Sequence, residues 1–285
     1  MKREIELAAI SASDVKALRD QTGVGMMDCK RALSEAEGDV KRAVELLRER
    51  GLAKAGKREG RATSEGGIAI SIDGGAGGMV EVGCETDFVA RTDDFGALTD
   101  LLARAVVADA SLIEPQALLE ASIDGKKVSD VVIEAIGTLG ENVVIKRVAR
   151  LEVDGVVGGY VHAGGKLGVI VGLQTADSGA DALAKDIAMH VAAADPVPVA
   201  VTRDGVPSEL LESERSIYVK QAEQEGKPAK VIEKIVQGKI NKFVSQICLS
   251  EQAFVKDPDR SVGEVLGDAA VTAFHRFKLG EASDQ

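Results

Sequence analysis

The chain has 285 residues, enough for two or three domains that each bury a core. Its formal net charge of −11 argues against a nucleic acid as the main ligand of the surface, and its three widely spaced cysteines favour reduced thiols over a disulfide framework. The N-terminus lacks the apolar segment of a signal peptide, and no apolar run approaches the roughly 20 residues of a membrane span. We therefore expect a soluble protein of the cytoplasm.

Three short helices are predicted near the N-terminus. Ser11 and Asp14 have the spacing of a capping box, and Gly23 is placed to end the first helix. Asp39 can cap the third helix, whose apolar stripe stops before Gly51. Three helices within so few residues form a marginal bundle of the kind that serves as a docking module.

A Gly-rich, mostly basic stretch, AKAGKREGRATSEG, follows these helices and shows no apolar period. Basic residues here could contact RNA, but a solvated linker is the simpler interpretation.

The central region contains a weak internal repeat. Residues 68–87 and 159–177 each predict a strand, a Gly-rich turn, a second strand and a polar exit. Each hairpin leads to an amphipathic helix, and a further strand, NVVIKRVARLEV, lies between the two. The predicted helix stripes are Phe95, Leu98, Leu102 and Val106 in the first, and Leu183, Ile187, Val191 and Ala194 in the second. The fold class is therefore α+β, with two related subdomains built on antiparallel sheets.

A helical hairpin is expected after Asp195–Pro198. Its first arm begins at Pro207–Ser208 and runs to about Gln224, residues 225–228 form the turn, and the second arm carries an apolar stripe. That stripe consists of Ile232, Val236, Ile240, Phe243 and Ile247. The last apolar segment, AVTAFHRF, is expected to return and complete the second subdomain.

Signatures of catalysis are weak or missing. GGAGG precedes a strand rather than a helix and lacks the Lys-Ser or Lys-Thr pair of a phosphate loop, so it predicts a hairpin turn. The three histidines are far apart, without a cysteine at ligand spacing, and His190 on an apolar helix face is expected to be a satisfied core histidine. We expect no enzyme, no cofactor and no bound metal.

One polar turn stands out because it contains a phenylalanine in an aromatic-poor chain. The stretch VEVGCETDFVARTDDF starts as a strand and then presents Thr86, Asp87, Phe88 and Val89 before the next helix. From the residues alone, Phe88 is expected to tuck into the protein's own core.

Four motifs resemble bacterial elongation factor Ts in order and spacing, over about residues 10–279: TGVGMMDCKRAL, GCETDFVAR, GENVVIKRV and DIAMHVAA. The resemblance implies a guanine-nucleotide exchange factor that binds the GDP form of elongation factor Tu, displaces Mg²⁺ and promotes GDP release during translation elongation. It also implies a heterodimer or a larger assembly with that GTPase, without direct contact to nucleic acid or membrane.

The resemblance assigns partner-binding residues as well. The Thr-Asp-Phe-Val turn of the family docks on the partner's GTPase domain and disturbs its magnesium site, which makes Phe88 an apolar wedge instead of a core residue. A second set is implied to contact the same domain, and one histidine to face the partner's third domain. The residues are Thr86, Asp87, Phe88 and Val89; then Arg19, Met26 and Met27; and then His162.

The implied architecture divides the chain into an N-terminal extension, a three-helix domain similar to ubiquitin-associated domains, a linker, two core subdomains and an inserted hairpin. The corresponding ranges are 1–9, 10–53, 54–66, 67–148, 149–202 with 246–285, and 203–245.

Two other classes of function stay open at this point. An adaptor or chaperone would use the three-helix domain alone for binding, and its core would be dispensable. A nucleotide-dependent oxidoreductase would bind nucleotide directly through its Gly-rich turns.

Overall fold

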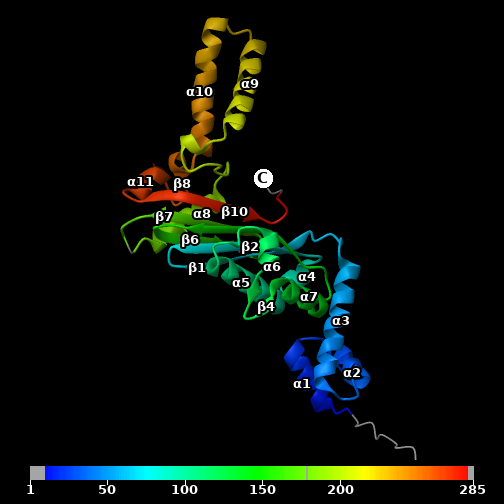
Figure 1. The fold of residues 1–285 in the computed structure, drawn as a ribbon. Helices are drawn as coiled ribbons and strands as arrows, with labels where there is room; N and C mark the ends of the chain where they lie inside the picture. The colour runs from blue at the N-terminus through cyan, green and yellow to red at the C-terminus, as the bar shows by residue number, and fades with distance from the viewer. Residues whose placement is uncertain (1–9, 163, 178, 282–285) are drawn as a thin grey trace, which may run out of the picture. The chain divides into compact units, whose positions relative to one another are not determined.

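A computed structural model describes residues 10–281 apart from residues 163 and 178 (Figure 1). The predicted extension at residues 1–9 lies outside the described residues, as do residues 282–285 at the end of the predicted second subdomain. The chain divides into two compact units, and each is described by itself. The first unit holds the described parts of 1–69, 80–148 and 279–285, and the second holds those of 70–79 and 149–278. Helices and small sheets occur together, which confirms the α+β class.

The described chain begins with the three predicted helices: α1 (Ala12–Thr22), α2 (Met26–Glu35) and α3 (Val40–Arg58). Ser11 and Asp14 form the expected capping box, in which each backbone amide donates to the other side chain at 3.1 Å. Gly23 ends α1 in the left-handed conformation, and Asp39 Oδ1 accepts two backbone amides at the start of α3. The helices share a small apolar core: Val15, Leu18, Cys29, Ala32, Leu33, Ala36, Ala43 and Leu47.

Helix α3 is longer than predicted, because it continues through Gly51 to Arg58. The predicted linker at residues 54–66 therefore begins with helical residues. The run AKAGKR supplies Ala, Lys and Arg, all good helix formers, while each glycine inside a helix costs only about 1 kcal/mol. Packing against α7 (Val128–Leu139) offsets this cost, and the Arg58 guanidinium donates to the Ile136 carbonyl at 3.0 Å.

A β-hairpin follows, in which β1 (Glu65–Asp73) and β2 (Ala76–Cys84) are joined by Gly74 and Gly75. Gly74 adopts φ 55°, a conformation that favours glycine. The turn therefore uses only the first two residues of GGAGG, and the rest of this stretch lies in β2. Strand β5 (Val144–Glu152) completes a sheet of order β1-β2-β5, whose strands contribute residues to both units.

Between β2 and β5 the chain is mainly helical. The elements before α7 are α4 (Asp87–Ala90), α5 (Asp93–Ala108), α6 (Pro115–Glu120), β3 (Ser122–Ile123) and β4 (Lys126–Lys127). Helix α5 buries the whole predicted stripe of Phe95, Leu98, Leu102 and Val106 against Val82 and other core residues. This core is the base on which the short helix α4 sits.

The second unit contains a sheet of order β10-β7-β6, formed by β6 (Gly155–Val161), β7 (Leu167–Gln174) and β10 (Ala270–Lys278). Strand β7 pairs antiparallel with both neighbours, so the last apolar segment completes this sheet as predicted. Helix α8 (Asp181–Ala193) packs on β6 and β7 and buries Ile187 and Val191. The approach is close, because a Cβ atom at Gly158 would lie 2.3 Å from the Ala184 carbonyl carbon.

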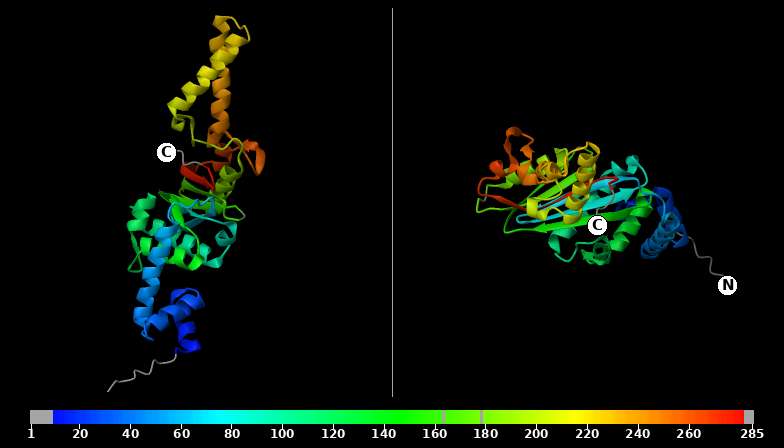
Figure 2. Two further views of the ribbon diagram at one scale, coloured as in Figure 1. Left: turned by 90° about the vertical axis from the view of Figure 1, so that its right-hand side faces the viewer. Right: turned by 90° about the horizontal axis from the view of Figure 1, so that it is seen from above.

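The predicted helical hairpin consists of α9 (Ser208–Gln224) and α10 (Ala229–Ile247), which lie side by side in both views of Figure 2. Val236 and Ile247 of the predicted stripe are buried. Short elements flank the hairpin: η1 (Arg203–Gly205), η2 (Leu249–Glu251), β8 (Ala253–Phe254), β9 (Asp257–Ser261) and α11 (Val262–Leu266). None of the described helices has the length and apolar character needed to cross a membrane. The sequence-based domain boundaries remain a proposal.

Candidate partner-binding surface

The four-residue helix α4 carries the residues that the resemblance assigns to partner binding. Thr86 is its N-cap, with an extended backbone at φ −128° and ψ 156°. The Thr86 Oγ1 atom accepts the Val89 amide at 3.4 Å and so satisfies one of the donors that a helix start leaves unpaired. The polar turn expected from the sequence is therefore a capped helical turn.

Phe88 is the most exposed large apolar side chain in the described part of the chain, with 82% of its surface accessible. The other five phenylalanines are buried or half-buried. Val89 and Ala90, its neighbours on α4, pack against the core of the first unit. The interpretation of Phe88 as a core residue is therefore wrong, and its ring faces water.

A second cap fixes where α4 ends. Thr92 Oγ1 accepts the Phe95 amide at 3.3 Å at the start of α5, and the Thr92 amide donates to the Val89 carbonyl at 3.0 Å. Asp87 pairs with Arg91 at 2.9 Å along the exposed side of the turn. Exposed ion pairs contribute only about 0–1 kcal/mol to stability. A partner group could therefore replace Arg91 beside the Asp87 carboxylate at little cost in free energy.

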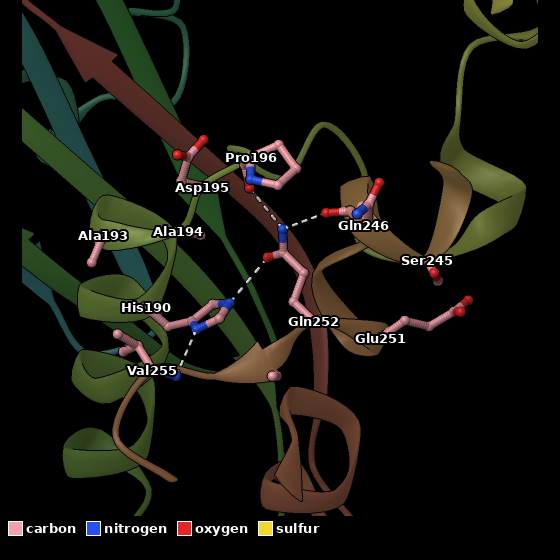
Figure 3. A pocket seen from close by; sticks show the side chains of 11 residues that line it. His190, Ala193, Ala194, Asp195, Pro196, Ser245, Gln246, Glu251, Gln252 and Val255 are labelled. Atoms are coloured by element: carbon pink, nitrogen blue, oxygen red, sulfur yellow. Dashed lines mark hydrogen bonds between the residues drawn. The ribbon is translucent and has the colours of Figure 1, made fainter. Parts of the chain in front are cut away.

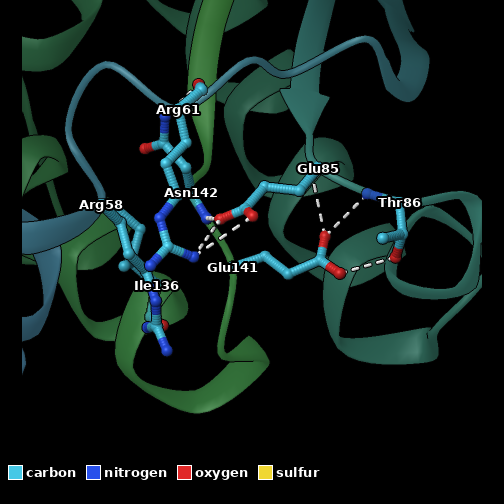
Figure 4. A network of polar contacts seen from close by, with 7 residues as sticks. All are labelled: Arg58, Arg61, Glu85, Thr86, Ile136, Glu141 and Asn142. Carbon is cyan, nitrogen blue, oxygen red and sulfur yellow. Dashed lines mark hydrogen bonds and ion pairs between the residues drawn. The ribbon is translucent and has the colours of Figure 1, made fainter.

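Two glutamates hold the start of this turn to the loop between α7 and β5 (Figure 4). Glu141 Oε2 accepts the amides of Glu85 and Thr86 at 3.0 and 2.9 Å, and Glu141 Oε1 accepts the Thr86 hydroxyl at 2.6 Å. In return, Glu85 Oε1 accepts the Asn142 amide at 2.7 Å. We call these four hydrogen bonds the carboxylate clasp. It joins two of the motifs that resemble the family, GCETDFVAR and GENVVIKRV.

The end of the predicted linker joins the same network. The Arg61 guanidinium lies 3.4 Å from Glu85 Oε2, and the Arg61 carbonyl accepts Asn142 Nδ2 at 3.0 Å. The Asn142 amide, and after it the Arg61 guanidinium, lower the pKa of Glu85 below its usual value. Glu85 is therefore a carboxylate near neutral pH, which strengthens its hydrogen bond to Asn142.

Cys84 lies directly before the clasp and is closed to solvent. Its Sγ atom donates to the Thr86 carbonyl at 3.2 Å. Burial, and after it the charge of Glu141, raise the pKa of the Cys84 thiol to about 11. Cys29 and Cys248 are also buried and free.

The second set of predicted contact residues lies in the three-helix bundle. Arg19 is exposed on the last turn of α1, and Met26 and Met27 open α2 with 44% and 67% of their surfaces accessible. Among the residues described, no hydrogen bond or ion pair joins these three to Thr86–Val89. They are placed where a partner could reach them, and their role stays a prediction.

His162 belongs to the second unit and follows β6. Its amide donates to the Leu167 carbonyl at 2.8 Å, and its Nδ1 lies 2.9 Å from the Tyr160 hydroxyl. The exposed ring borders a mostly apolar hollow of about 440 Å³, which Met189 and Val255 also line. The predicted contact of His162 with a partner stays a prediction.

His190, the histidine predicted to be a satisfied core residue, lines a larger hollow of about 580 Å³ (Figure 3). That prediction is confirmed: the Val255 amide donates to Nδ1 at 3.1 Å, and Nε2 lies 3.0 Å from Gln252 Oε1. Gln252 Nε2 in turn donates to the carbonyls of Pro196 and Gln246 at 2.9 and 2.7 Å. Because Nδ1 accepts, the neutral ring carries its proton on Nε2. In the described chain no group of His, Cys and acidic side chains could hold a metal ion.

Sequence reasoning missed the residues that position α4, namely Glu85, Glu141 and Asn142. Each lies inside a motif that carries the resemblance, which was the available signal. Nothing in the sequence, however, pairs two segments that are 55 residues apart.

Comparisons with known proteins agree on one family. The family model described as Elongation factor TS matches residues 85–281. The Elongation factor Ts of Hydrogenovibrio crunogenus is 45% identical over 96% of this chain and 92% of its own length. The proteins of the same name from an Arthrobacter species and from Deinococcus radiodurans are 46% and 47% identical, over 96% and 93% of this chain and 100% and 98% of their own lengths.

Proposed function

The chain belongs to the elongation factor Ts family of translation elongation factors, and we propose that it is a guanine-nucleotide exchange factor for elongation factor Tu. It binds the GDP form of that GTPase, displaces Mg²⁺ from the partner's nucleotide site and promotes GDP release. It performs no covalent chemistry and needs no cofactor, and it acts in the cytoplasm. Membership in the family supports the choice of partner.

One observation carries the mechanism: an apolar ring is held in water on a turn built from polar groups. A phenylalanine side chain buries about 150–250 Å² when it is covered, which is worth roughly 4–6 kcal/mol at about 25 cal/mol/Å². Phe88 forgoes most of this stabilisation in the free protein, because 82% of its surface is accessible. A ring that is exposed at this cost is well suited to insert into a partner.

Exchange requires that binding of the factor and binding of the nucleotide weaken each other. Thermodynamic coupling makes this effect reciprocal, so the factor must bind a conformation of the partner in which nucleotide and Mg²⁺ fit poorly. We assign to Phe88 the separation of packed elements near the phosphates. Asp87 would then pair with polar groups or a helix N-terminus exposed by that movement.

Thr86 and Val89, the first and last residues of the turn, fix the backbone on either side of Asp87 and Phe88. Thr86 caps α4 and is held by Glu141, and Val89 packs against the core of the first unit. Arg19, Met26 and Met27 would add contacts to the GTPase domain, and His162 would contact the third domain. The complex would be a heterodimer or a larger assembly of the two proteins.

The proposal is tested by mixing the chain with elongation factor Tu loaded with fluorescent GDP and following release by stopped flow. The wild-type chain should accelerate release, and Phe88→Ala should reduce the stimulated rate about ten- to a thousandfold, as loss of an interface anchor does. The melting temperature should stay unchanged, since the ring is exposed in the free protein.

Ile113→Ala is the matched control, because Ile113 is an apolar side chain of the first unit that is 57% exposed and has no proposed role. It should release GDP at the wild-type rate. If the wild-type chain fails to stimulate GDP release while its three-helix part binds other proteins, the proposed exchange function is wrong and the adaptor function is favoured. A normal rate for Phe88→Ala would remove the wedge from the mechanism.

A further inference from the structure

We infer that Glu141 is a positioning residue for Phe88: the carboxylate clasp holds α4 in the orientation that presents the ring. The inference rests on the proposed function, in which Phe88 acts on the partner. Glu141 itself is given no contact with that partner.

The geometry concentrates three donors on one side chain. The amides of Glu85 and Thr86 and the hydroxyl of Thr86 all donate to the Glu141 carboxylate, at 2.6–3.0 Å. Hydrogen bonds to a charged acceptor are shorter and about twice as strong as neutral ones. Only Asp87 separates this fixed point from Phe88, so the clasp limits the direction in which the Cα–Cβ bond of Phe88 points.

The clasp is also reciprocal, which makes it resist displacement from either side. The Glu85 side chain accepts the Asn142 amide at 2.7 Å, while the neighbouring Glu141 side chain accepts the Glu85 amide. Sliding one segment past the other would break bonds in both directions. Arg61 closes the network through its contacts with Glu85 and Asn142.

The clasp borders the apolar core of the first unit, since Cys84 and Val143 on either side of it belong to that core. The apolar core around Phe95 and Val82 includes none of the four clasp residues Glu85, Thr86, Glu141 and Asn142. Polar contacts at the margin of a core open locally more easily than the core itself. Loss of Glu141 should therefore loosen α4 far more than it lowers global stability.

The first test needs no partner. Amide hydrogen exchange of the full chain is measured by NMR in the wild type and in Glu141→Ala. The amides of Glu85 and Thr86 should exchange at least about tenfold faster in the variant, while amides of α5 keep their protection. Glu264→Ala is the matched control, because Glu264 Oε2 also accepts an amide and a hydroxyl, those of Ser261, on another helix. It should leave Glu85 and Thr86 unchanged.

The second test is a double-mutant cycle on stimulated GDP release. Glu141→Ala should slow release about tenfold in the wild-type background and less than about twofold in the Phe88→Ala background, because a residue that acts through Phe88 has nothing left to position. Glu141→Gln should restore most of the rate, since its carbonyl can accept both amides and its NH₂ group can donate to Thr86 Oγ1. Glu141→Asp, which keeps the charge but is one methylene shorter, should be intermediate.

The outcomes separate this inference from the proposed function. Equal losses from Glu141→Ala in both backgrounds, or unchanged exchange of the Glu85 and Thr86 amides, would overturn the positioning role. Absence of stimulation by the wild-type chain would overturn the proposed function instead, and the amide measurement would still decide whether the clasp holds the turn. If Glu141→Ala does not fold, the same comparisons are made with Glu141→Asp, which is also expected to slow release and to speed exchange of the Glu85 and Thr86 amides.

Discussion

The two hairpin-and-helix regions follow one plan but differ at the point where strand becomes helix. After β2 the chain forms α4 and then α5, and threonine side chains cap both helices. After β7 it enters α8 from Ala180 without any side-chain cap. The first region uses polar groups to hold an apolar ring in water, whereas the second buries a polar ring, His190, and gives both of its nitrogens hydrogen-bond partners.

This difference shows how one of two similar frameworks can present an exposed apolar ring, the proposed binding feature. The core of each region comes from the same kind of helix stripe packed on the same kind of strand. The proposed binding feature comes from a few residues between strand and helix, which are held mainly by hydrogen bonds to Glu141 and Asn142. Loss of a core residue should therefore lower the free energy of unfolding, whereas loss of Phe88 should slow stimulated GDP release and leave the free energy of unfolding nearly unchanged.

The largest effect is expected from Phe95→Ala, seven residues after the exposed Phe88. Phe95 is 1% exposed in the core of the first unit, so the variant should lose about 3–5 kcal/mol of unfolding free energy. Urea denaturation measures this loss, and Phe88→Ala should stay within about 0.5 kcal/mol of the wild type. Similar losses in both variants would remove the contrast between the two rings.

A smaller effect on the free energy of unfolding is expected from a change of pH. It tests the buried histidine of the second region. Burial lowers the pKa of His190, an effect that the hydrogen bond to Gln252 opposes. The unfolded chain therefore binds a proton, at an ordinary pKa of about 6.5, that the folded ring resists. Stability conferred by the neutral ring is present above that pH and falls as the pH drops below it, by at most about 1.4 kcal/mol per pH unit.

The contribution of His190 can be isolated by urea denaturation between pH 5 and 7.5. His190→Gln should show a shallower slope than the wild type, although His275, whose pKa burial also lowers, keeps part of it. The groups around His190 are Gln252, the Val255 amide, the Phe254 ring at 5.9 Å, and the acids Asp195 and Glu251 that line the same hollow. Glu251, whose pKa Arg203 lowers, loses its contribution only below about pH 4.5. An identical slope in the variant would assign the effect to other groups.

The smallest effect is expected from shortening the helical hairpin. Its base packs through Val206, Leu210, Leu211, Ile240, Phe243, Val244 and Ile247, so the replacement should spare these residues. Exchanging residues 213–237 for a short Gly-rich loop should change stimulated GDP release by less than about threefold, because the hairpin is remote in sequence from α4. A role of the removed part in association or stability would appear in sedimentation or melting. A loss as large as that of Phe88→Ala, in a folded variant, would place the hairpin in the mechanism.

Local signals predicted most of the fold because they depend on neighbouring residues. The capping box of Ser11, the left-handed Gly23 and the start of α9 after Pro207 each follow from side chains within a few positions. The length of α3 could not be predicted from local signals, because its glycine-containing end is stabilised by tertiary contacts with α7. The clasp could not be predicted either, since Glu141 and Thr86 meet only through the tertiary fold.

The candidate site was predictable in part. The resemblance identified the turn, while the residues alone favoured a buried Phe88, since apolar rings usually lie inside. Its exposure depends on Val89 and Ala90 occupying the core side of a helix only four residues long. A turn this short has too few residues for periodicity to show which side chain points inward.

The closed environment of Cys84 has a practical consequence for following this turn in solution. With a pKa of about 11, only about one in ten thousand of its thiols is ionised at pH 7, and Cys29 and Cys248 are buried as well. The three thiols of the native chain should therefore react only slowly with maleimide dyes. A single cysteine introduced at the exposed Asp94, one turn beyond α4, would accept a fluorophore selectively and report the arrival of a partner at Phe88 in real time.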